Sequence, residues 1–211
     1  MRRSTICFYP QKPMSNPFQS GPFVSRLLVA ILCLCACSAP LVSTDLQSLA
    51  TTLDGKPFDP FRAADGKVVV LIFVRTDCPI SDRYAPVIQR LSAQHHDHAA
   101  FFLVYPGKRE TPDAIRKHDH DFGYALAALR DPQHALVKQS EAQITPEAAV
   151  FDISHQLIYH GRIDNLYEDV AHKRKSATTH ELADAIEAAI AGKPLKAKTM
   201  PAVGCYLSDL E

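Results

Sequence analysis

The stretch Val74-Arg75-Thr76-Asp77-Cys78-Pro79-Ile80-Ser81 decides the fold of this chain. This stretch begins with the last residue of the apolar run Lys67–Val74. The β-branched and aromatic residues of that run are typical of a strand buried on both faces. Beyond it, apolar residues recur at the spacing of one helix face, at Tyr84, Val87, Ile88 and Leu91. The pattern predicts a strand, a short junction and a helix, with Cys78 where the helix begins.

Strand and helix patterns alternate along the rest of the chain. We expect strands over Ala99–Tyr105, Tyr124–Leu129, Ala148–Asp152 and Gln156–His160, and helices over Thr111–Asp121, Pro132–Ala142 and Thr179–Ala191. The last two strands flank a three-residue turn and predict a hairpin. This order predicts an α/β fold with three layers, in which a mixed central sheet has helices on both faces.

The first 36 residues have the pattern of a signal peptide. Four basic residues and no acidic residue accompany the apolar run Leu27–Ala36. A transmembrane helix needs roughly 20 apolar residues, about twice the length of this run, so the signal peptide is the better interpretation. Met14 offers a second start for a shorter signal, and the Arg2-Arg3 pair is weakly suggestive of twin-arginine export.

Charge and length characterise the chain beyond the presequence. The presequence carries none of the 23 acidic residues and four of the 23 basic ones, so the rest of the chain has a net charge of −4. This negative balance argues against nucleic acid as a partner. We expect a tether over residues 37–51, one domain over 52–192 and a C-terminal tail over 193–211.

The segment Leu34-Cys35-Ala36-Cys37 resembles a bacterial lipobox. The resemblance implies cleavage before Cys37 and lipidation of that cysteine. The protein would then be exported and held at a membrane, on the periplasmic or cell-envelope side.

The number and positions of the cysteines limit the thiol chemistry that is open to the processed chain. Of six cysteines, three would leave with the presequence and Cys37 would carry lipid, which leaves Cys78 and Cys205 in a compartment that permits disulfides. A structural disulfide is one interpretation of this pair. The other is a redox site, because a helix N-terminus favours a thiolate at Cys78. Nearby charges act in both directions, since Arg75 and Arg83 favour the thiolate and Asp77 opposes it.

Two motifs resemble the thioredoxin superfamily. The helix start Cys78-Pro79-Ile80-Ser81, followed by Ala85-Pro86, is similar to the Cys-x-x-Cys helix of that family. The segment Ile144-Thr145-Pro146 is similar to its cis-proline loop, which faces the reactive cysteine. Within the superfamily, residues 52–191 look most like the redoxin branch of alkyl hydroperoxide reductase and thiol-specific antioxidant proteins. The resemblance implies that Cys78 is the nucleophile, that the Thr145-Pro146 backbone orients the substrate, and that no cofactor is needed.

The chain departs from the family patterns at three places. Ser81 stands where a thioredoxin has its second cysteine, so any resolving thiol lies elsewhere. Leu71 and Arg75 stand where peroxiredoxins have proline and threonine or serine. The chain has no tryptophan, although one often precedes the motif in thioredoxin-like reductases.

The tail offers a resolving thiol. The segment Thr199–Cys205 resembles the Gly-Cys tails of exported redoxins, and a mobile tail could bring Cys205 to Cys78. An idle or structural thiol is the alternative.

The sequence leaves three functions open. The first is an extracytoplasmic thiol-disulfide oxidoreductase that acts on a protein or small-molecule disulfide and is recycled by a thiol reductant. The second is a thiol peroxidase, in which peroxide oxidises Cys78 to a sulfenic acid. The third is a metal-binding or copper-delivery protein that uses Cys78 and nearby histidines, because histidines gather at residues 95–98 and 118–120. We expect those histidines to lie on solvated helix ends, assign no metal ligands to them, and expect His172–Lys175 to be an exposed loop.

Overall fold

Strand β3 (Val68–Phe73) is buried on both of its faces. The side chains of Val68, Val70 and Ile72 belong to the core on one face, whereas Val69, Leu71 and Phe73 belong to the core on the other. This alternation is the period of two that a strand imposes. The prediction of a strand between two helical layers is confirmed.

The computed structural model describes residues 49–207. The expected signal peptide, Cys37, most of the expected tether and the last four residues lie outside that range. Within it, no helix has the length and apolar character needed to cross a membrane.

The central sheet has eight strands and is mixed. Its order across the sheet is β2 (Pro57–Phe58), β1 (Ala50–Thr52), β5 (Ala127–Arg130), β4 (Ala99–Tyr105), β3, β7 (Glu147–Phe151), β8 (Leu157–Gly161) and β9 (Thr199–Met200). Strands β3, β4 and β5 are parallel, whereas β7 is antiparallel to both β3 and β8. The expected hairpin is the pair β7–β8.

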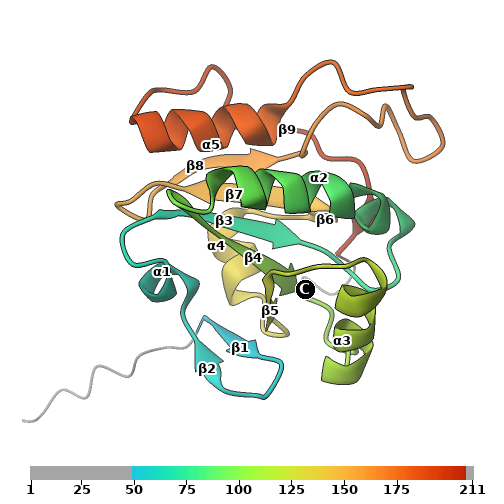
Figure 1. Cartoon of the computed structure of the whole chain (residues 1–211). Coiled ribbons are helices and arrows are strands. Elements are labelled where there is room, and N and C mark those ends of the chain that lie inside the picture. Colours follow the sequence, from blue (N-terminus) through green and yellow to red (C-terminus); the bar gives the residue numbers. More distant parts are fainter. Residues whose placement is uncertain (1–48, 208–211) are drawn as a thin grey trace, which may run out of the picture. The chain divides into compact units, whose positions relative to one another are not determined.

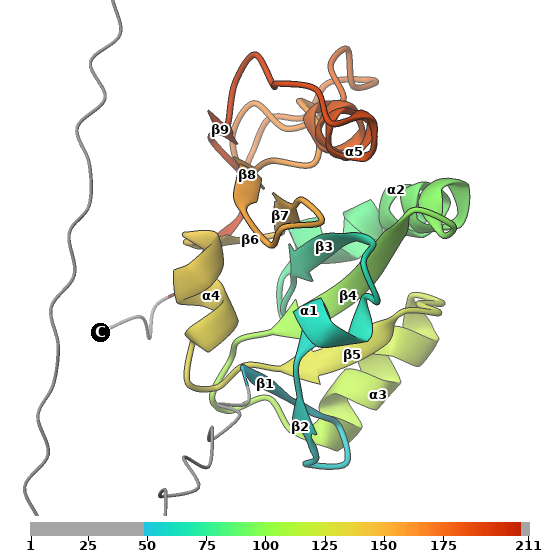
Figure 2. The same ribbon diagram turned by 90° about the vertical axis from the view of Figure 1, so that its left-hand side faces the viewer.

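Helices cover both faces of this sheet (Figures 1 and 2). The core on one face takes residues from α2 (Pro79–His95), α3 (Pro112–Asp121) and α5 (Glu181–Ala191). The core on the other face takes residues from α1 (Pro60–Ala63) and α4 (Ala135–Ser140). The predicted three-layer α/β architecture is therefore confirmed.

Several elements begin at other residues than expected. Strand β5 starts at Ala127 and not at Tyr124, and helix α5 starts at Glu181 and not at Thr179. Helix α4 starts three residues after Pro132, because His134 has left-handed backbone geometry (φ 59°) and the Asp131 carboxylate accepts hydrogen bonds from the backbone N–H groups of Ala135 and Val137. The folded part already includes Ala50, since β1 pairs with β5.

The tail differs most from the expectation. Residues 199–200 form β9, which pairs with β8, and Cys205–Tyr206 form β10, which pairs antiparallel with β6 (Ile144–Thr145). The tail was expected to be separate and mobile, but it is hydrogen-bonded to the domain at two places. None of β1, β2, α1, β6, β9 and β10 was anticipated from the sequence pattern.

Candidate active site

Cys78 is the N-cap residue of α2, directly after the loop that follows β3. Pro79 occupies the first turn, where its missing N–H costs no hydrogen bond. The cysteine is 0% exposed to solvent. A short junction between a buried strand and a helix thus places this thiol inside the domain, at a helix N-terminus, as the sequence predicts.

The loop that faces Cys78 contains Thr145 and Pro146, and the peptide bond between them is cis. The Cys78 thiol donates a hydrogen bond from Sγ to the carbonyl oxygen of Thr145, over 3.1 Å. The cis-proline segment expected from the motif is therefore present and contacts the cysteine.

Cys205 completes the cluster from the tail. Its backbone pairs with Thr145 in the β10–β6 ladder, and the Thr145 hydroxyl donates to the Cys205 carbonyl oxygen over 3.4 Å. Both cysteines are free thiols, and Cys205 is partly exposed. The structure thus brings Cys78, Ser81, Thr145 and Cys205 together.

The surroundings of Cys78 favour its thiolate. Burial alone would raise the pKa of this thiol, but hydrogen bonds from the Cys205 thiol, the Ser81 hydroxyl and backbone N–H, and the Thr145 hydroxyl outweigh it and hold the pKa below its ordinary value. The Ser81 hydroxyl oxygen is buried and makes no full hydrogen bond in the described part of the chain, so its hydroxyl is available to the nearby Cys78 sulfur, whose pKa it helps to lower. Ser81 therefore serves the thiolate at the position where a thioredoxin has a thiol.

The surroundings of Cys205, in contrast, favour its neutral thiol. Burial, and then the neighbouring Cys78 sulfur, raise the pKa of Cys205 to about 12. Ionising it would place a second negative charge beside the Cys78 thiolate. Of the two thiols, Cys78 therefore loses its proton more readily, and Cys205 is the one that keeps its proton and can donate to it.

The neighbouring charges have little influence on Cys78 because they neutralise each other. Arg75 and Asp77 form a salt bridge of 2.7 Å, and the side chain of Arg83 is exposed to solvent. Hydrogen bonds to the sulfur, and not charges in the sequence around it, settle which protonation state is favoured.

Glu110 is a site residue that the sequence did not indicate. Its carboxylate accepts hydrogen bonds from the backbone N–H of Thr76 over 2.7 Å and of Gly107 over 3.1 Å. Burial raises the pKa of this carboxyl group, although both hydrogen bonds oppose the rise. Glu110 fixes the loop that precedes Cys78, and no local pattern marks an acid for this task.

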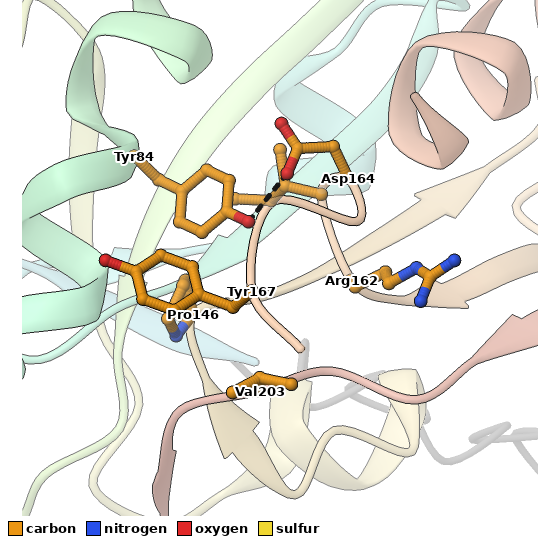
Figure 3. Close-up of a pocket in the computed structure, with 7 residues that line it drawn as sticks. Tyr84, Pro146, Arg162, Asp164, Tyr167 and Val203 are labelled. Atoms are coloured by element: carbon orange, nitrogen blue, oxygen red, sulfur yellow. Dashed lines mark hydrogen bonds between the residues drawn. The ribbon is translucent and has the colours of Figure 1, made fainter. Parts of the chain in front are cut away.

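A second unanticipated contact joins α2 to the segment after β8. The Tyr84 hydroxyl donates to Asp164 Oδ1 over 2.7 Å, inside the domain. Figure 3 shows this pair beside Tyr167, Pro146 and the tail residue Val203. These residues line a cavity of about 10 Å³, which has room for a single water molecule.

The histidine clusters do not form a metal site in the described residues. No group of three histidine, cysteine, aspartate or glutamate side chains within residues 49–207 has the arrangement to hold a metal ion. His118 is buried, contrary to the expected solvated position. Its Nδ1 lies 2.8 Å from the Tyr105 hydroxyl and its Nε2 lies 3.0 Å from Asp82 Oδ1.

Solved structures place this architecture among known folds. No protein-family model matches the chain, and no curated protein matches it in sequence. An uncharacterized conserved protein from Geobacillus kaustophilus is similar in structure, with a TM-score of 0.65 and 21% identity, over 75% of this chain and 86% of that one. A hypothetical protein from Sinorhizobium meliloti has a TM-score of 0.61 and 22% identity, over 75% and 88%.

A third similar structure carries a fold name. It is a thioredoxin-like protein from Porphyromonas gingivalis, with a TM-score of 0.51 and 14% identity, over 71% of this chain and 93% of that one. Together with the mixed sheet and its two helical layers, this similarity shows that the chain has a thioredoxin-like fold.

Proposed function

We propose that the protein is a thiol-disulfide oxidoreductase whose redox pair is Cys78 and Cys205. One observation carries the proposal: a buried cysteine at a helix N-terminus, whose surroundings favour its thiolate, lies beside a second cysteine on a strand paired with the cis-proline loop. A thiolate of this kind is the nucleophile of disulfide exchange. Ser81 excludes a local dithiol and leaves Cys205 as the resolving thiol.

The reaction has two exchange steps. The Cys78 thiolate attacks one sulfur of a substrate disulfide, the substrate S–S bond breaks, and the other substrate sulfur leaves as a thiolate. Cys205 then loses its proton and attacks Cys78 Sγ, and the remaining substrate thiol leaves. Two electrons pass to the substrate, the protein holds a Cys78–Cys205 disulfide, and a thiol reductant returns it to the dithiol.

The same proposal includes an extracytoplasmic location. The presequence pattern of residues 1–36 and the lipobox-like segment ending at Cys37 support export and lipid anchoring. Both lie outside the described residues. An oxidising compartment suits a protein whose two remaining cysteines form a reversible disulfide.

Turnover of insulin disulfides with a thiol reductant tests the activity. We expect Cys78→Ala to abolish turnover, and Cys205→Ser to accumulate a mixed disulfide between Cys78 and the substrate, visible by mass spectrometry. Full turnover by Cys205→Ser would remove Cys205 from the mechanism. Rapid peroxide consumption without insulin turnover would favour a thiol peroxidase, and stoichiometric Cu(I) binding would favour metal delivery.

A further inference from the structure

The C-terminal segment 199–207, which we call the strap, is bonded to the domain along its length. Strand β9 pairs with β8 at its start, and β10 pairs with β6 near its end. The last described residue, Leu207, is buried, and its backbone N–H donates to the Gln143 carbonyl oxygen over 3.0 Å. Arg75 donates from Nη1 to the Tyr206 carbonyl oxygen over 3.4 Å. The strap therefore occupies a defined position.

Two glycines make that position possible. A Cβ atom on Gly204 would lie 2.0 Å from the Thr145 carbonyl oxygen, and one on Gly161 of β8 would lie 2.0 Å from the Met200 carbonyl oxygen. Both obstacles are backbone atoms, which cannot move aside as a flexible side chain can. Both the strap and the strand it pairs with therefore have glycine where the two backbones approach most closely.

The two cysteines differ in how far they are exposed to solvent. Cys78 is completely buried, whereas Cys205 is partly exposed and its neighbour Tyr206 is 73% exposed. The strand position along β6, where an extended peptide could pair with the Thr145 backbone, is filled by β10. Figure 3 shows the strap residue Val203 beside Pro146, in the wall of the same small cavity.

From this arrangement, and resting on the function proposed above, we infer that the docked strap shields Cys78, that it opens when Cys78 attacks a substrate disulfide, and that an external dithiol reductant exchanges with the protein at Cys205. The reductant is a molecule or protein with two neighbouring thiols. One of its thiolates attacks Cys205 Sγ of the oxidised protein, the Cys78–Cys205 bond breaks, and Cys78 leaves as a thiolate. The second thiol of the reductant then attacks its own mixed-disulfide sulfur, and Cys205 leaves and takes up a proton.

The pKa values of the two thiols support attack by the reductant at Cys205 and not at Cys78. Exchange is faster when the leaving thiol has the lower pKa, and the pKa of Cys78 is lowered while that of Cys205 is raised. Attack at Cys205 therefore releases the better leaving group, and it takes place at the cysteine residue that is partly exposed. Attack at Cys78 would require both a poor leaving group and removal of the strap.

The first test asks which sulfur an external thiol reaches. The purified oxidised chain is mixed briefly with glutathione, quenched with N-ethylmaleimide and analysed by peptide mapping, which separates Cys78 and Cys205 from the presequence cysteines. We expect glutathione on Cys205 and maleimide on Cys78. Glutathione on Cys78, with maleimide on Cys205, would overturn the inference and leave the proposed function intact. Failure to form the Cys78–Cys205 disulfide would contradict both.

The second test opens the strap. In the reduced protein, Gly204→Ala should raise the rate at which iodoacetamide alkylates Cys78 about tenfold, which corresponds to about 1.4 kcal/mol of lost docking free energy. Loss of the Cys205 hydrogen bond would lower the thiolate fraction and slow alkylation, so a faster rate can only reflect access. Tyr206→Ser, which keeps the strap backbone, is the matched control and should leave the rate unchanged. A Gly204→Ala rate equal to wild type would refute the shielding.

Discussion

At the scale of single residues, the redox chemistry rests on the hydrogen bonds around one sulfur atom. Cys78 is removed from water, which favours the neutral thiol, yet donors from Cys205, Ser81 and Thr145 reverse the preference. The backbone carbonyl of Thr145 works against them, because it can bond only to the protonated thiol. A few hydrogen-bond donors therefore set the balance between thiol and thiolate at Cys78, and removing one of them should change the Cys78 pKa measurably.

Ser81→Ala should raise the pKa of Cys78. Alkylation of Cys78 increases with pH as the thiol ionises, and in the wild type this increase should come at a lower pH than for an ordinary cysteine. The variant should need a higher pH, and below the pKa its rate should fall about threefold to tenfold, the effect of one net hydrogen bond. The pH profile of alkylation measures it. Ser140→Ala is the control, since Ser140 is equally buried but lies on α4 and is not among the groups that lower the Cys78 pKa. Equal profiles for Ser81→Ala and wild type would contradict this account.

Ser81→Cys should rebuild a local dithiol. Residues 78 and 81 are one helical turn apart at the start of α2, and the Ser81 side chain already bonds to the Cys78 sulfur. A second thiol there would release substrate without the strap, so insulin turnover should increase. Single-turnover kinetics of the double variant Ser81→Cys with Cys205→Ser would check it. If that variant is as slow as Cys205→Ser alone, Cys78 does not act on disulfides as proposed.

At the scale of elements, helix α2 is held in place by a buried polar contact as well as by its apolar face. The Tyr84 hydroxyl donates to Asp164, whose carboxylate also accepts from the Leu166 backbone N–H over 2.9 Å. Burial and the Asp164 carboxylate raise the pKa of Tyr84 far above its ordinary value, so the hydroxyl keeps its proton. The contact fixes the helix that carries Cys78 against the segment that follows β8.

Tyr84→Phe should lower the free energy of unfolding by about 1.5–3 kcal/mol, the usual contribution of a hydrogen bond to a charged group. The aromatic ring stays, so the loss reports the hydroxyl alone. Urea denaturation measures it, and Tyr206→Phe serves as control because that hydroxyl belongs to an exposed side chain. A loss below about 0.5 kcal/mol, which is ordinary for surface changes, would mean that the contact does not anchor α2.

The elements that the sequence predicted are the long ones. Strand β3 has a continuous apolar run and helix α2 has an apolar period long enough to show, and each packs as its pattern predicts. Strands β6, β9 and β10 have two residues each, too few for any period. They exist because their partners lie beside them, which is information that a local pattern does not contain.

The site residues also divide into those that a local motif marks and those that only the fold brings together. Cys78, Ser81 and Pro146 lie in local motifs and could be identified from the sequence. Glu110 and Asp164 act across the fold through single contacts, so nothing next to them in the chain marks their roles. Cys205 was named as a partner for Cys78, but its docked strand depends on the fit of Gly204 against the Thr145 carbonyl, which only the fold creates.

At the scale of the whole molecule, the proposed lipid anchor decides where this chemistry takes place. If Cys37 is lipidated, the protein should stay with membranes after a high-salt wash, and Cys37→Ala should release or misprocess it. A processed lipoprotein carries more than one acyl chain, which gives stable anchoring where a single chain does not. Fractionation with immunoblotting measures it, with Cys7→Ala as the matched cysteine control. A wild-type protein found wholly in the soluble fraction would contradict the anchor.

The redox state should also change the stability of the whole domain. A Cys78–Cys205 disulfide closes a loop of roughly 125 residues, and constraint of the unfolded chain by such a loop is worth about 4–5 kcal/mol. Strand β10 already lies against β6 in the reduced protein, so oxidation has little native structure to rearrange and most of that stabilisation should remain. We therefore expect the oxidised protein to unfold at a clearly higher urea concentration than the reduced protein.

Cys205→Ser is the control for this comparison, and its unfolding midpoint should be nearly the same with and without oxidant. If the bridge is verified by mass spectrometry and the wild-type midpoint still does not rise, forming the bond must distort the native state by about as much as it constrains the unfolded one. The docked position of the strap would then not be the position from which Cys205 bonds to Cys78.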